Sequence, residues 1–488
     1  MKPLTTETLE KAFEIPKKPE VIEKQRLAVR YHIEDKHLVD NNRPQKFLEA
    51  MAAILKHSNY RFVLDHYIRT SAKCSRCTVQ CQVYEATKDL RDIPCYRSEL
   101  LLKVYRRHFT VAGTLRGRLT NDPGLTDDDI EDMARSFYDC TACRRCQNEC
   151  PAGIDHGMIT HLGRYILSEI GIVPRALVVS TREQLIGDSH NTSAIPVPAL
   201  KDTLEFLEEE MAETKGVEVK FPLDVEGADY IFIPAVSDFL MEAETLMGNA
   251  CVFHATGDSW TIGTGDFDGI NYGLFYSDHV LEKVLLNMEK EVERLKIKKG
   301  IIIGECGHAS RSAKFFYNNF AERFPMPVIN CMEYAHDALE AGKLKFDRSI
   351  IKETVTYHDP CNIARSGWII KQPRELIKAF IDDFVEMDKI GKDAVCCGGG
   401  GGTVSLDEIR PYRTTIGGYK KAKQITATIK EGKAHYTIGP CANCKKQLKE
   451  LIEDQNIPSE LVGLHDLIYR AIILSDDGVA WREPEGIF

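Results

Sequence analysis

The sequence has no long hydrophobic run. Although 43% of its 488 residues are hydrophobic, its most apolar stretch, residues 154–180, is interrupted by Arg164, Glu169 and Arg175. A membrane-spanning helix needs about 20 consecutive apolar residues, and residues 1–14 are polar and acidic, unlike a signal peptide. We therefore expect no transmembrane segment and a cytoplasmic location. Peripheral attachment at the inner face of a membrane, through a partner, stays open.

Basic residues are too few for a nucleic-acid-binding protein. The formal net charge is −10, whereas binding to a phosphate backbone requires a basic face. A nucleotide or flavin fingerprint is also missing, because Gly263 and Gly265 are not followed by the remaining spacing of a dinucleotide-binding turn. The sequence therefore excludes nucleic acid as a partner and predicts no bound nucleotide or flavin.

Cysteine, in contrast, is abundant and unevenly distributed. Of the 16 cysteines, eight lie between Cys74 and Cys150 and five between Cys361 and Cys444. In a long intracellular chain, clustered cysteines favour metal binding over disulfides. The two groups indicate two separate metal-binding regions.

Periodic patterns divide the chain into a helical half and a mixed half. Up to residue 172 the apolar residues follow helical spacing, including an amphipathic stretch that begins at Pro19. From Tyr230 onward, short β-branched runs alternate with helices, which predicts parallel sheet covered by helices. The predicted strands are residues 230–233, 251–253, 300–303, 327–329, 355–357 and 436–438. The expected fold class is α+β multidomain, with an all-α ferredoxin-like domain followed by an α/β domain.

A weak internal repeat indicates that the α/β domain is duplicated. Ile233-Pro234-Ala235 resembles Asp359-Pro360-Cys361, and Gly304-Glu305-Cys306-Gly307 resembles Gly439-Pro440-Cys441-Ala442. In this alignment the loop at 257–260 takes the place of Cys396-Cys397-Gly398. The predicted division is a helical segment at 1–60, a helical two-cluster domain at 61–172, a connection carrying one helix at 173–226 and the duplicated domain at 227–488.

The most regular cysteine motif lies at the end of the helical half. Cys140, Cys143, Cys146 and Cys150 precede Pro151 in a C-x2-C-x2-C-x3-C-P pattern. A tight loop of this kind delivers three thiolates to one four-iron cube, and in two-cluster ferredoxins its fourth cysteine ligates the other cube. A structural zinc site would need only two C-x2-C pairs. The pattern therefore indicates an iron–sulfur cluster.

A second, less regular set supplies the remaining ligands needed for two cubes. Cys74, Cys77 and Cys81 fit the last three positions of the same motif, and Cys95 restores the count to eight ligands for two four-iron cubes. A bystander role for Cys95, as a buried thiol, stays open. The crossed arrangement places Cys74, Cys77, Cys95 and Cys150 on one cube and Cys81, Cys140, Cys143 and Cys146 on the other.

The C-terminal group has a different pattern, built around an adjacent pair. Its five members are Cys361, Cys396, Cys397, Cys441 and Cys444. Adjacent side chains cannot easily occupy two corners of a small cube, but they can bridge or flank a larger, open cluster. Gly398, Gly399 and Gly400 follow the pair, and glycine allows positive φ and close approach of amide donors to a cofactor. A structural zinc site is the alternative.

With Gly398, these five cysteines resemble the cysteine-rich CCG domain of heterodisulfide reductases. Residues 60–488 resemble the fused type, in which a helical two-cluster ferredoxin domain precedes the CCG domain, and the related catalytic subunit of sulfite-reductase-linked membrane complexes. The resemblance implies that the five cysteines hold a noncubane [4Fe-4S] cluster. It also implies that two [4Fe-4S] cubanes deliver electrons to that cluster one at a time, for disulfide cleavage.

The sequence departs from this family in the first half of the duplicated domain. Heterodisulfide reductases carry two CCG motifs, whereas here the first is reduced to Cys306. Ala235, Asp258 and Ser259 are aligned with its missing ligands. Only one noncubane cluster is therefore expected, and heterodisulfide reduction itself is in doubt.

The degenerate half still carries polar groups suited to catalysis. Because duplicated α/β units place equivalent loops at one shared crevice, Glu305, Cys306 and His308 are predicted to face the noncubane cluster. His308 is the candidate proton donor, since imidazole titrates near neutral pH. A purely structural histidine is the alternative.

The predicted function is that of an iron–sulfur oxidoreductase subunit for disulfide or thiol reduction in anaerobic energy metabolism. One alternative is a relay subunit of a larger quinone-linked, bifurcating or acyl-CoA-reducing complex. Another is the iron–sulfur subunit of a 2-hydroxy-acid oxidase. Electrons must enter from another redox subunit: a flavoprotein, a ferredoxin, a hydrogenase-like protein or a membrane cytochrome or quinone subunit.

Overall fold

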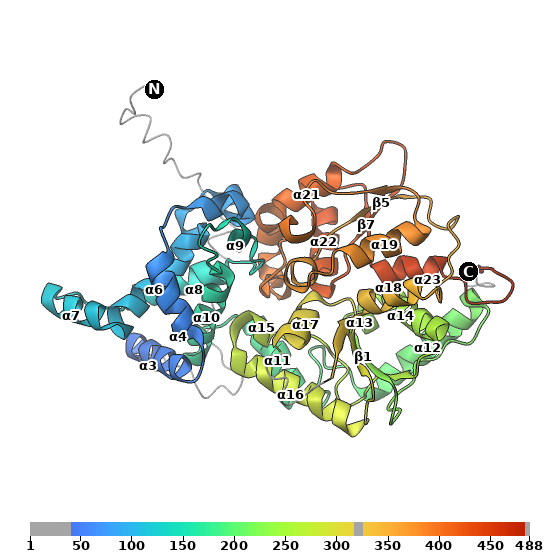
Figure 1. Cartoon of the computed structure of the whole chain (residues 1–488), viewed down its shortest axis with the longest axis horizontal. Coiled ribbons are helices and arrows are strands. Elements are labelled where there is room, and N and C mark those ends of the chain that lie inside the picture. Colours follow the sequence, from blue (N-terminus) through green and yellow to red (C-terminus); the bar gives the residue numbers. More distant parts are fainter. Residues whose placement is uncertain (1–40, 317–325, 484–488) are drawn as a thin grey trace.

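The computed structural model describes residues 41–316 and 326–483. The amphipathic stretch predicted from Pro19 lies outside these ranges. A helical part occupies one end of the molecule and two α/β units occupy the other (Figure 1). In the described ranges, no helix combines the length and the apolar character needed to cross a bilayer.

The helical part is built on amphipathic helices with clear start signals. A capping box of Thr126 and Asp129 begins one helix, and Pro94 occupies the first turn of another. Phe47, Leu101 and Phe137 are fully buried in a core shared by these helices. The main ones are α3 (Arg43–Lys56), α4 (Tyr60–Thr70), α6 (Pro94–Phe109), α7 (Val111–Thr120), α8 (Asp127–Tyr138) and α10 (His156–Glu169).

The connection at 173–226 carries two helices, not the single one predicted. The missed helix is α11 (Arg175–Ile186), which precedes α12 (Val197–Lys215). It forms because Leu177 and Val178 are buried in the core of the α/β units. The segment is thus packed structure rather than a plain connection. The domain limits at residues 60, 172 and 226 stay a prediction.

Two four-stranded parallel sheets have equivalent strand orders, as a duplicated unit requires. The orders are β2-β1-β3-β4 and β6-β5-β7-β8. The central strands of the first sheet, β1 and β3, are rich in isoleucine, and those of the second, β5 and β7, contain threonine and tyrosine, yet most of their residues are buried, as in sheets covered on both faces. The strands are β1 (Tyr230–Ile233), β2 (Trp260–Thr261), β3 (Gly300–Ile303), β4 (Val328–Asn330), β5 (Thr354–Tyr357), β6 (Phe384–Val385), β7 (His435–Ile438) and β8 (Glu460–Val462).

One predicted strand is wrong. Residues 251–253 lie inside helix α14 (Ala243–Thr256), where Cys251, Val252 and Phe253 are all buried. A short apolar run fits a buried helix as well as a buried strand, so periodicity does not separate the two. The three strands missed from the sequence, β2, β6 and β8, are two or three residues long and lie at sheet edges.

The topology also corrects part of the predicted repeat. Cys396 and Cys397 follow β6, whereas Asp258 and Ser259 precede the equivalent strand β2. These two residues are therefore not the counterparts of the adjacent cysteines. The pairing of Cys306 with Cys441 is consistent with the topology, because each follows a central strand and directly precedes a helix, α17 (Gly307–Arg311) or α22 (Ala442–Asp454).

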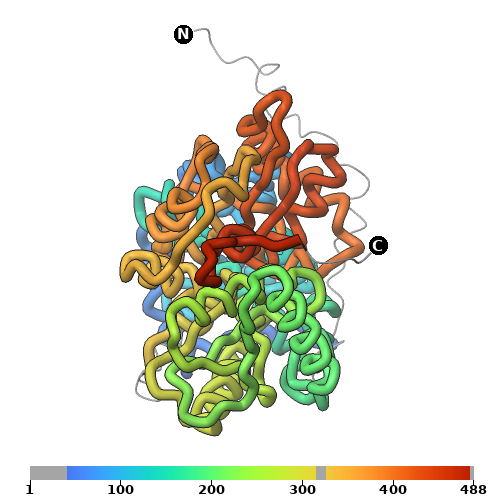
Figure 2. The backbone as a smooth tube through the Cα atoms, turned by 90° about the vertical axis from the view of Figure 1, so that its right-hand side faces the viewer, coloured from blue at the N-terminus to red at the C-terminus, as the bar shows by residue number. Residues whose placement is uncertain are grey.

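The two α/β units pack directly on each other. The first unit, green to yellow, lies below the second, orange to red, in Figure 2. Helix α23 (Leu464–Ala471) of the second unit crosses α14 of the first so closely that a Cβ on Gly248 would lie 2.0 Å from the His465 carbonyl oxygen. This close packing fixes the loops at the junction, where the cysteines lie.

Candidate iron–sulfur centres

Four cysteines line one small hollow near the surface of the helical part: Cys74, Cys77, Cys95 and Cys150. Cys77 hydrogen-bonds Cys95, which raises the pKa of Cys77 and lowers that of Cys95 to about 6. Ser75, in left-handed conformation, turns the loop between Cys74 and Cys77. Cys74 is exposed. The sequence grouped these four residues on one cube, and the fold brings them together.

The other four ferredoxin-like cysteines, Cys81, Cys140, Cys143 and Cys146, are all partly buried. Burial raises the pKa of Cys146, and the neighbouring thiols of Cys143, Cys140 and Cys81 raise it further. Ala142 and Arg144 adopt left-handed conformations that turn the loop around this centre. The grouping is again the one expected from the crossed motif.

The five C-terminal cysteines form a continuous chain of sulfur contacts. Cys396 hydrogen-bonds Cys361 and Cys397, and Cys444 hydrogen-bonds Cys397 and Cys441. All except Cys361 are buried. Five converging sulfurs suit an iron–sulfur cluster well, because thiolate is the ligand these clusters use.

His358 lies against this chain of sulfurs. Its ring and the sulfurs of Cys397 and Cys444 offer ligand atoms that all lie within 4.8 Å of one another. The side chain is fully buried, and in the described structure neither ring nitrogen has a nitrogen or oxygen partner. Burial lowers the pKa of His358. A neutral imidazole beside two sulfurs can donate a hydrogen bond to one of them or bind the metal.

Lys421 is a residue of this site that the sequence did not reveal. It is 1% exposed, and burial lowers its pKa to about 8, although Asp359 and three of the cysteines favour its charged form. Its Nζ lies 3.2 Å from the Met387 sulfur. A lysine in a helix full of lysines gives no sequence signal, so its position could be found only from the fold.

The set that contains Cys140, Cys143 and Cys146 touches the C-terminal cysteine set. The Cys143 thiol is hydrogen-bonded to that of Cys396, and this bond, with burial, raises the pKa of Cys143. Arg365 reinforces the junction by donating to the Cys143 carbonyl at 2.5 Å and to the Ala394 carbonyl at 2.5 Å. The two candidate centres are therefore neighbours.

A buried arginine, Arg164, joins the same two loops. It donates to the carbonyls of Phe137, Cys140 and Gly401 at 2.7, 2.6 and 2.8 Å, and its side chain is 1% exposed. The guanidinium thus pairs the cubane loop with the glycine loop.

The three predicted cofactor-binding glycines have different roles in the structure. The Gly398 amide lies 3.4 Å from the Cys396 sulfur, and its φ of +103° is unfavourable for other residues. Gly399 packs against Gln447, and a Cβ on Gly400 would lie 2.3 Å from the Thr141 carbonyl oxygen. Only Gly398 is seen to offer an amide to sulfur, whereas Gly400 permits close approach of the helical part.

The degenerate half meets the third site through the loop at Cys306. The Gly307 amide donates to the Cys441 sulfur at 3.2 Å, and the Ala442 amide donates to the Glu305 carbonyl at 2.8 Å. The equivalent turns of the two units therefore face each other. His308 lies 3.4 Å from the Cys306 sulfur and also hydrogen-bonds Cys441.

The Glu305 carboxylate points away from the third site. It accepts a hydrogen bond from the His465 ring at 2.8 Å and pairs with Lys445 at 3.3 Å, and all three side chains are fully buried. Burial raises the pKa of Glu305. The charge of Lys445 and the hydrogen bond from His465 outweigh this effect and lower the pKa to about 2. Of the predicted catalytic group, Cys306 and His308 are brought to the sulfurs, and Glu305 contributes only its backbone.

Comparisons with known proteins agree with this arrangement. A 4Fe-4S dicluster domain matches residues 72–154, and a cysteine-rich domain matches residues 355–449. An Hdr-like menaquinol oxidoreductase iron-sulfur subunit 2 of Archaeoglobus fulgidus is 28% identical, over 90% of this chain and 84% of its own length. A dihydromethanophenazine:CoB–CoM heterodisulfide reductase subunit of Methanosarcina barkeri is 24% identical, over 78% of this chain and 87% of its own length.

These matches cover the helical part and the second α/β unit, the two regions that contain the cysteine sets. They bear out the prediction of iron–sulfur binding made from the cysteine motifs. The chain combines a 4Fe-4S dicluster domain with a CCG-type cysteine-rich domain, and its predicted resemblance to heterodisulfide reductase-like iron–sulfur proteins is confirmed.

Proposed function

We propose that this chain is an iron–sulfur oxidoreductase subunit that relays electrons through two [4Fe-4S] cubanes to a noncubane [4Fe-4S] cluster, where a disulfide is reduced to thiols. The contact between Cys143 and Cys396 carries the proposal. It joins the ligand set of one cubane to that of the third cluster, so no further protein is needed between them.

The burial of the cysteines supports an order for the relay. Cys74, at the first cubane, is exposed, whereas Cys396 and Cys397 are buried. We infer that electrons enter at the Cys74 set, pass to the Cys140 set and leave through the third cluster. The relatives named as menaquinol oxidoreductase and heterodisulfide reductase subunits support a redox partner at the entry side.

The proposed ligands of the third cluster are Cys361, Cys396, Cys397, Cys441 and Cys444. When bound, this cluster would supply electrons one at a time. Reduction of a disulfide to two thiols takes two such electrons. The His358 ring lies within 4.8 Å of the Cys397 and Cys444 sulfurs, where a hydrogen bond to a cluster ligand would adjust the charge at this site. His308 lies beside Cys441 and is the group placed to deliver a proton to a thiolate product.

A cavity of about 520 Å³ leads toward this site. Tyr272 and Ala442 form part of its wall, and Tyr272 stacks on His308 with ring centroids 6.2 Å apart. The Ser405 hydroxyl bonds the Tyr272 hydroxyl at 3.1 Å. Because Tyr272 both lines this cavity and stacks on His308, the cavity is the proposed substrate entrance.

A relay role without substrate chemistry is the second candidate, and the burial of the third site favours it. Cys396, Cys397, Cys441 and His308 are each at most 4% exposed. Electron transfer to a partner does not require an exposed cluster, whereas binding of a substrate at the cluster does.

Stoichiometric reduction separates the two candidates. Anaerobically purified protein, reduced with excess dithionite and freed of it, is mixed with a small disulfide, and the free thiols are counted. Two thiols per disulfide consumed, abolished by Cys397→Ser, support substrate chemistry. If the reduced clusters stay reduced in the presence of disulfide yet reoxidise with a quinone analogue, the relay role holds and disulfide reduction is wrong.

A further inference from the structure

Helix α7 projects from the end of the helical part, at the far left of Figure 1. One face of α7 packs against the last turn of α6. A Cβ on Gly113 would lie 1.7 Å from the Arg106 carbonyl oxygen, and one on Gly117 would lie 2.0 Å from the Arg107 guanidinium. The glycines therefore let α7 lie directly against the end of α6. This packing fixes which face of the helix points outward.

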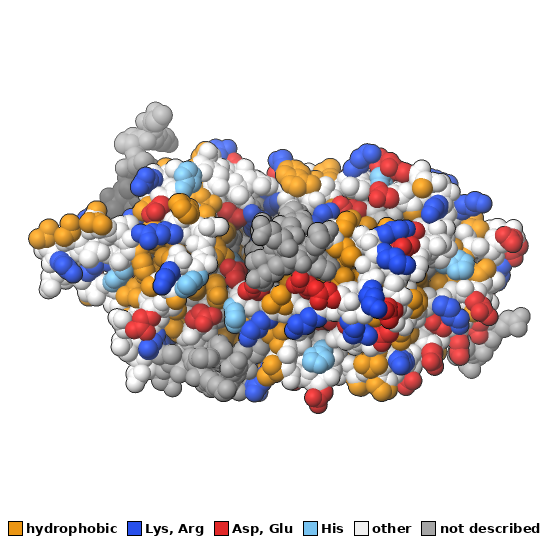
Figure 3. Space-filling view, turned by 60° about the horizontal axis from the view of Figure 1, so that its bottom comes forward, with side chains coloured by type: hydrophobic (Ala, Val, Ile, Leu, Met, Phe, Trp, Pro, Cys, Tyr) orange, Lys and Arg blue, Asp and Glu red, His pale blue; other side chains and the backbone are white. Residues whose placement is uncertain are grey.

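The outward face carries three large apolar side chains. Val111, Leu115 and Leu119 are spaced at four-residue intervals, so they lie on one side of the helix, opposite Gly113 and Gly117. Their exposed fractions are 80%, 55% and 87%. Figure 3 shows hydrophobic side chains along this end of the molecule, with basic ones close by. A contiguous apolar stripe of this kind indicates an interaction surface.

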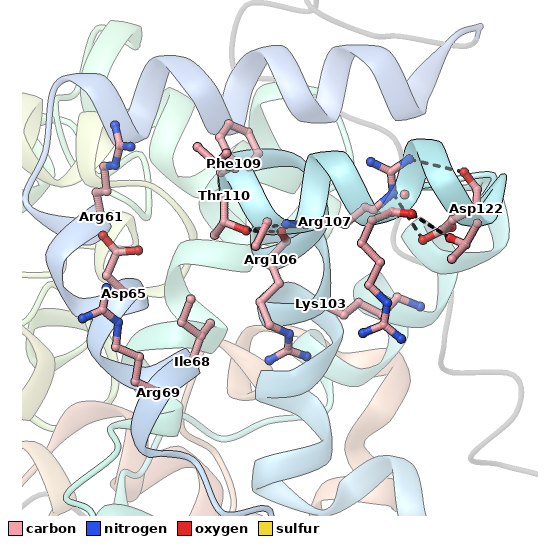
Figure 4. Close-up of a pocket in the computed structure, with 16 residues that line it drawn as sticks. Arg61, Asp65, Ile68, Arg69, Lys103, Arg106, Arg107, Phe109, Thr110 and Asp122 are labelled. Carbon is pink, nitrogen blue, oxygen red and sulfur yellow. Dashed lines mark hydrogen bonds and ion pairs between the residues drawn. The ribbon is translucent and has the colours of Figure 1, made fainter.

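A basic groove lies beside the stripe. A cavity of about 860 Å³ between α4, α6 and α7 is lined by six basic side chains and two acidic ones. In Figure 4, Arg61 and Arg69 of α4 lie across the cavity from Lys103 and Arg106 of α6. The basic lining residues are Arg61, Arg69, Lys103, Arg106, Arg107 and Arg116.

Several of these charges have little compensation. Among the described residues, no ion pair involves Arg69, Arg116 or the nearby Arg118. The other groove cations are partly compensated, because Arg107 pairs with Asp122 at 3.2 Å, Arg106 with Glu99 and Lys103 with Asp129. The groove is thus locally positive in a chain whose net charge is −10. The local sign favours an anionic ligand, and the overall sign opposes unspecific attraction to anionic surfaces.

We propose that α7 and its basic groove form a peripheral docking site for an anionic phospholipid bilayer. Val111, Leu115 and Leu119 enter the boundary between headgroups and acyl chains, and the groove arginines bind headgroup phosphates. Exposed apolar side chains that enter this boundary, flanked by arginines at the phosphate level, are a common way to bind a membrane surface.

The shape of the surface favours lipid over a protein partner. The stripe is a convex ridge at an end of the molecule, and a fluid bilayer accommodates a ridge without a matching groove. The arginines beside the stripe also favour a bilayer, because the long apolar stem of arginine can lie along the acyl boundary while its charge stays at the phosphates. The inference does not depend on the cluster chemistry proposed above.

Vesicle co-sedimentation of the purified full-length holoprotein tests the proposal. The probes are vesicles of phosphatidylcholine alone and vesicles with 30% phosphatidylglycerol added. We expect binding to the anionic vesicles at low salt, weaker binding as salt rises and none to phosphatidylcholine. Leu115→Glu combined with Leu119→Glu should weaken binding at least about tenfold, and Arg69→Gln and Arg116→Gln about fivefold each.

Phe206→Glu is the matched control, because Phe206 is 61% exposed on α12, distant from α7. It should bind like the wild type, and all variants should keep the wild-type iron content. Absence of wild-type binding overturns the proposal, and so does binding that survives the α7 substitutions. If those substitutions instead disrupt a co-purified protein complex while no vesicle binding occurs, α7 is a protein-docking helix and the lipid proposal is wrong.

Discussion

Cys143 of the helical part and Cys396 of the second α/β unit are hydrogen-bonded to each other, although 253 residues separate them in the sequence. Each belongs to a different predicted ligand set. Because Arg365 and Arg164 hold the surrounding backbone with several buried hydrogen bonds, the contact is built into the fold rather than left to two mobile loops. The proposed electron transfer between the two sites would therefore need no domain movement.

The ligand count predicts about twelve iron atoms per chain, in three four-iron clusters. Anaerobically purified protein should give this value by metal analysis together with an equal amount of acid-labile sulfide. Iron near eight would remove the third cluster, and one zinc per chain would make the C-terminal site structural.

Cys397→Ser should remove the third cluster alone and lower the iron content by about one third. Cys397 contacts Cys444 and Cys396, whereas Cys396 also contacts Cys143. We therefore expect Cys396→Ser to disturb the neighbouring cubane as well. Low-temperature EPR of both variants measures this. Identical cubane signals in the two would show that the Cys143 contact does not matter.

His358→Asn should leave the iron content unchanged and shift the midpoint potential of the third cluster to a lower value. Hydrogen bonds to cluster sulfurs raise the potential, and this imidazole has no other polar partner in the described structure. A redox titration followed by EPR gives the shift. His435→Gln is the control, since His435 bonds Thr428 and Ser459 far from the sulfurs. Loss of iron in His358→Asn would make His358 a metal ligand instead.

His308→Gln should slow disulfide reduction by about a hundredfold while the clusters keep their spectra, because a positioned proton donor contributes at least that much. Steady-state rates across pH 6–9 give the measurement. If the wild-type and variant rates coincide, His308 only packs against Tyr272 and Phe275.

Arg164→Met should lower the free energy of unfolding by about 3 kcal/mol or more, because the carbonyls of Phe137, Cys140, Phe275 and Gly401 lose their donor. Urea unfolding of the anaerobic protein gives the change. Arg348→Met is the control, since Arg348 is about half exposed and pairs with the exposed Asp382; its effect should be under about 1 kcal/mol. An equal loss in both variants would contradict a special role for Arg164.

The sequence anticipated the features that depend on local spacing. Ligand cysteines with two or three residues between them are readable because one loop must deliver them together. The central strands are readable because they are short runs of β-branched and apolar residues. Strand β2 was missed because two edge residues carry no periodicity. The run at 251–253 was misassigned because α14 is buried on all sides and shows no alternation.

Long-range features of the site could not be predicted in this way. Glu305 was expected to face the cluster, but its carboxylate forms an ion pair with Lys445 of the other α/β unit. Lys421 and Arg164 occur in ordinary helical patterns, and only packing makes them part of the site. The positions of such residues depend on how the units dock, which no spacing along the chain encodes.

The Cys143–Cys396 contact also has a consequence for how the protein is loaded with iron. The thiols of Cys143 and Cys396, which are proposed to serve different clusters, lie against each other. Oxidation would join them in one disulfide, so that a single bond would deprive both sites of a ligand at once. If the two sites take up the proposed clusters, we expect loading under reducing conditions to avoid this cross-link.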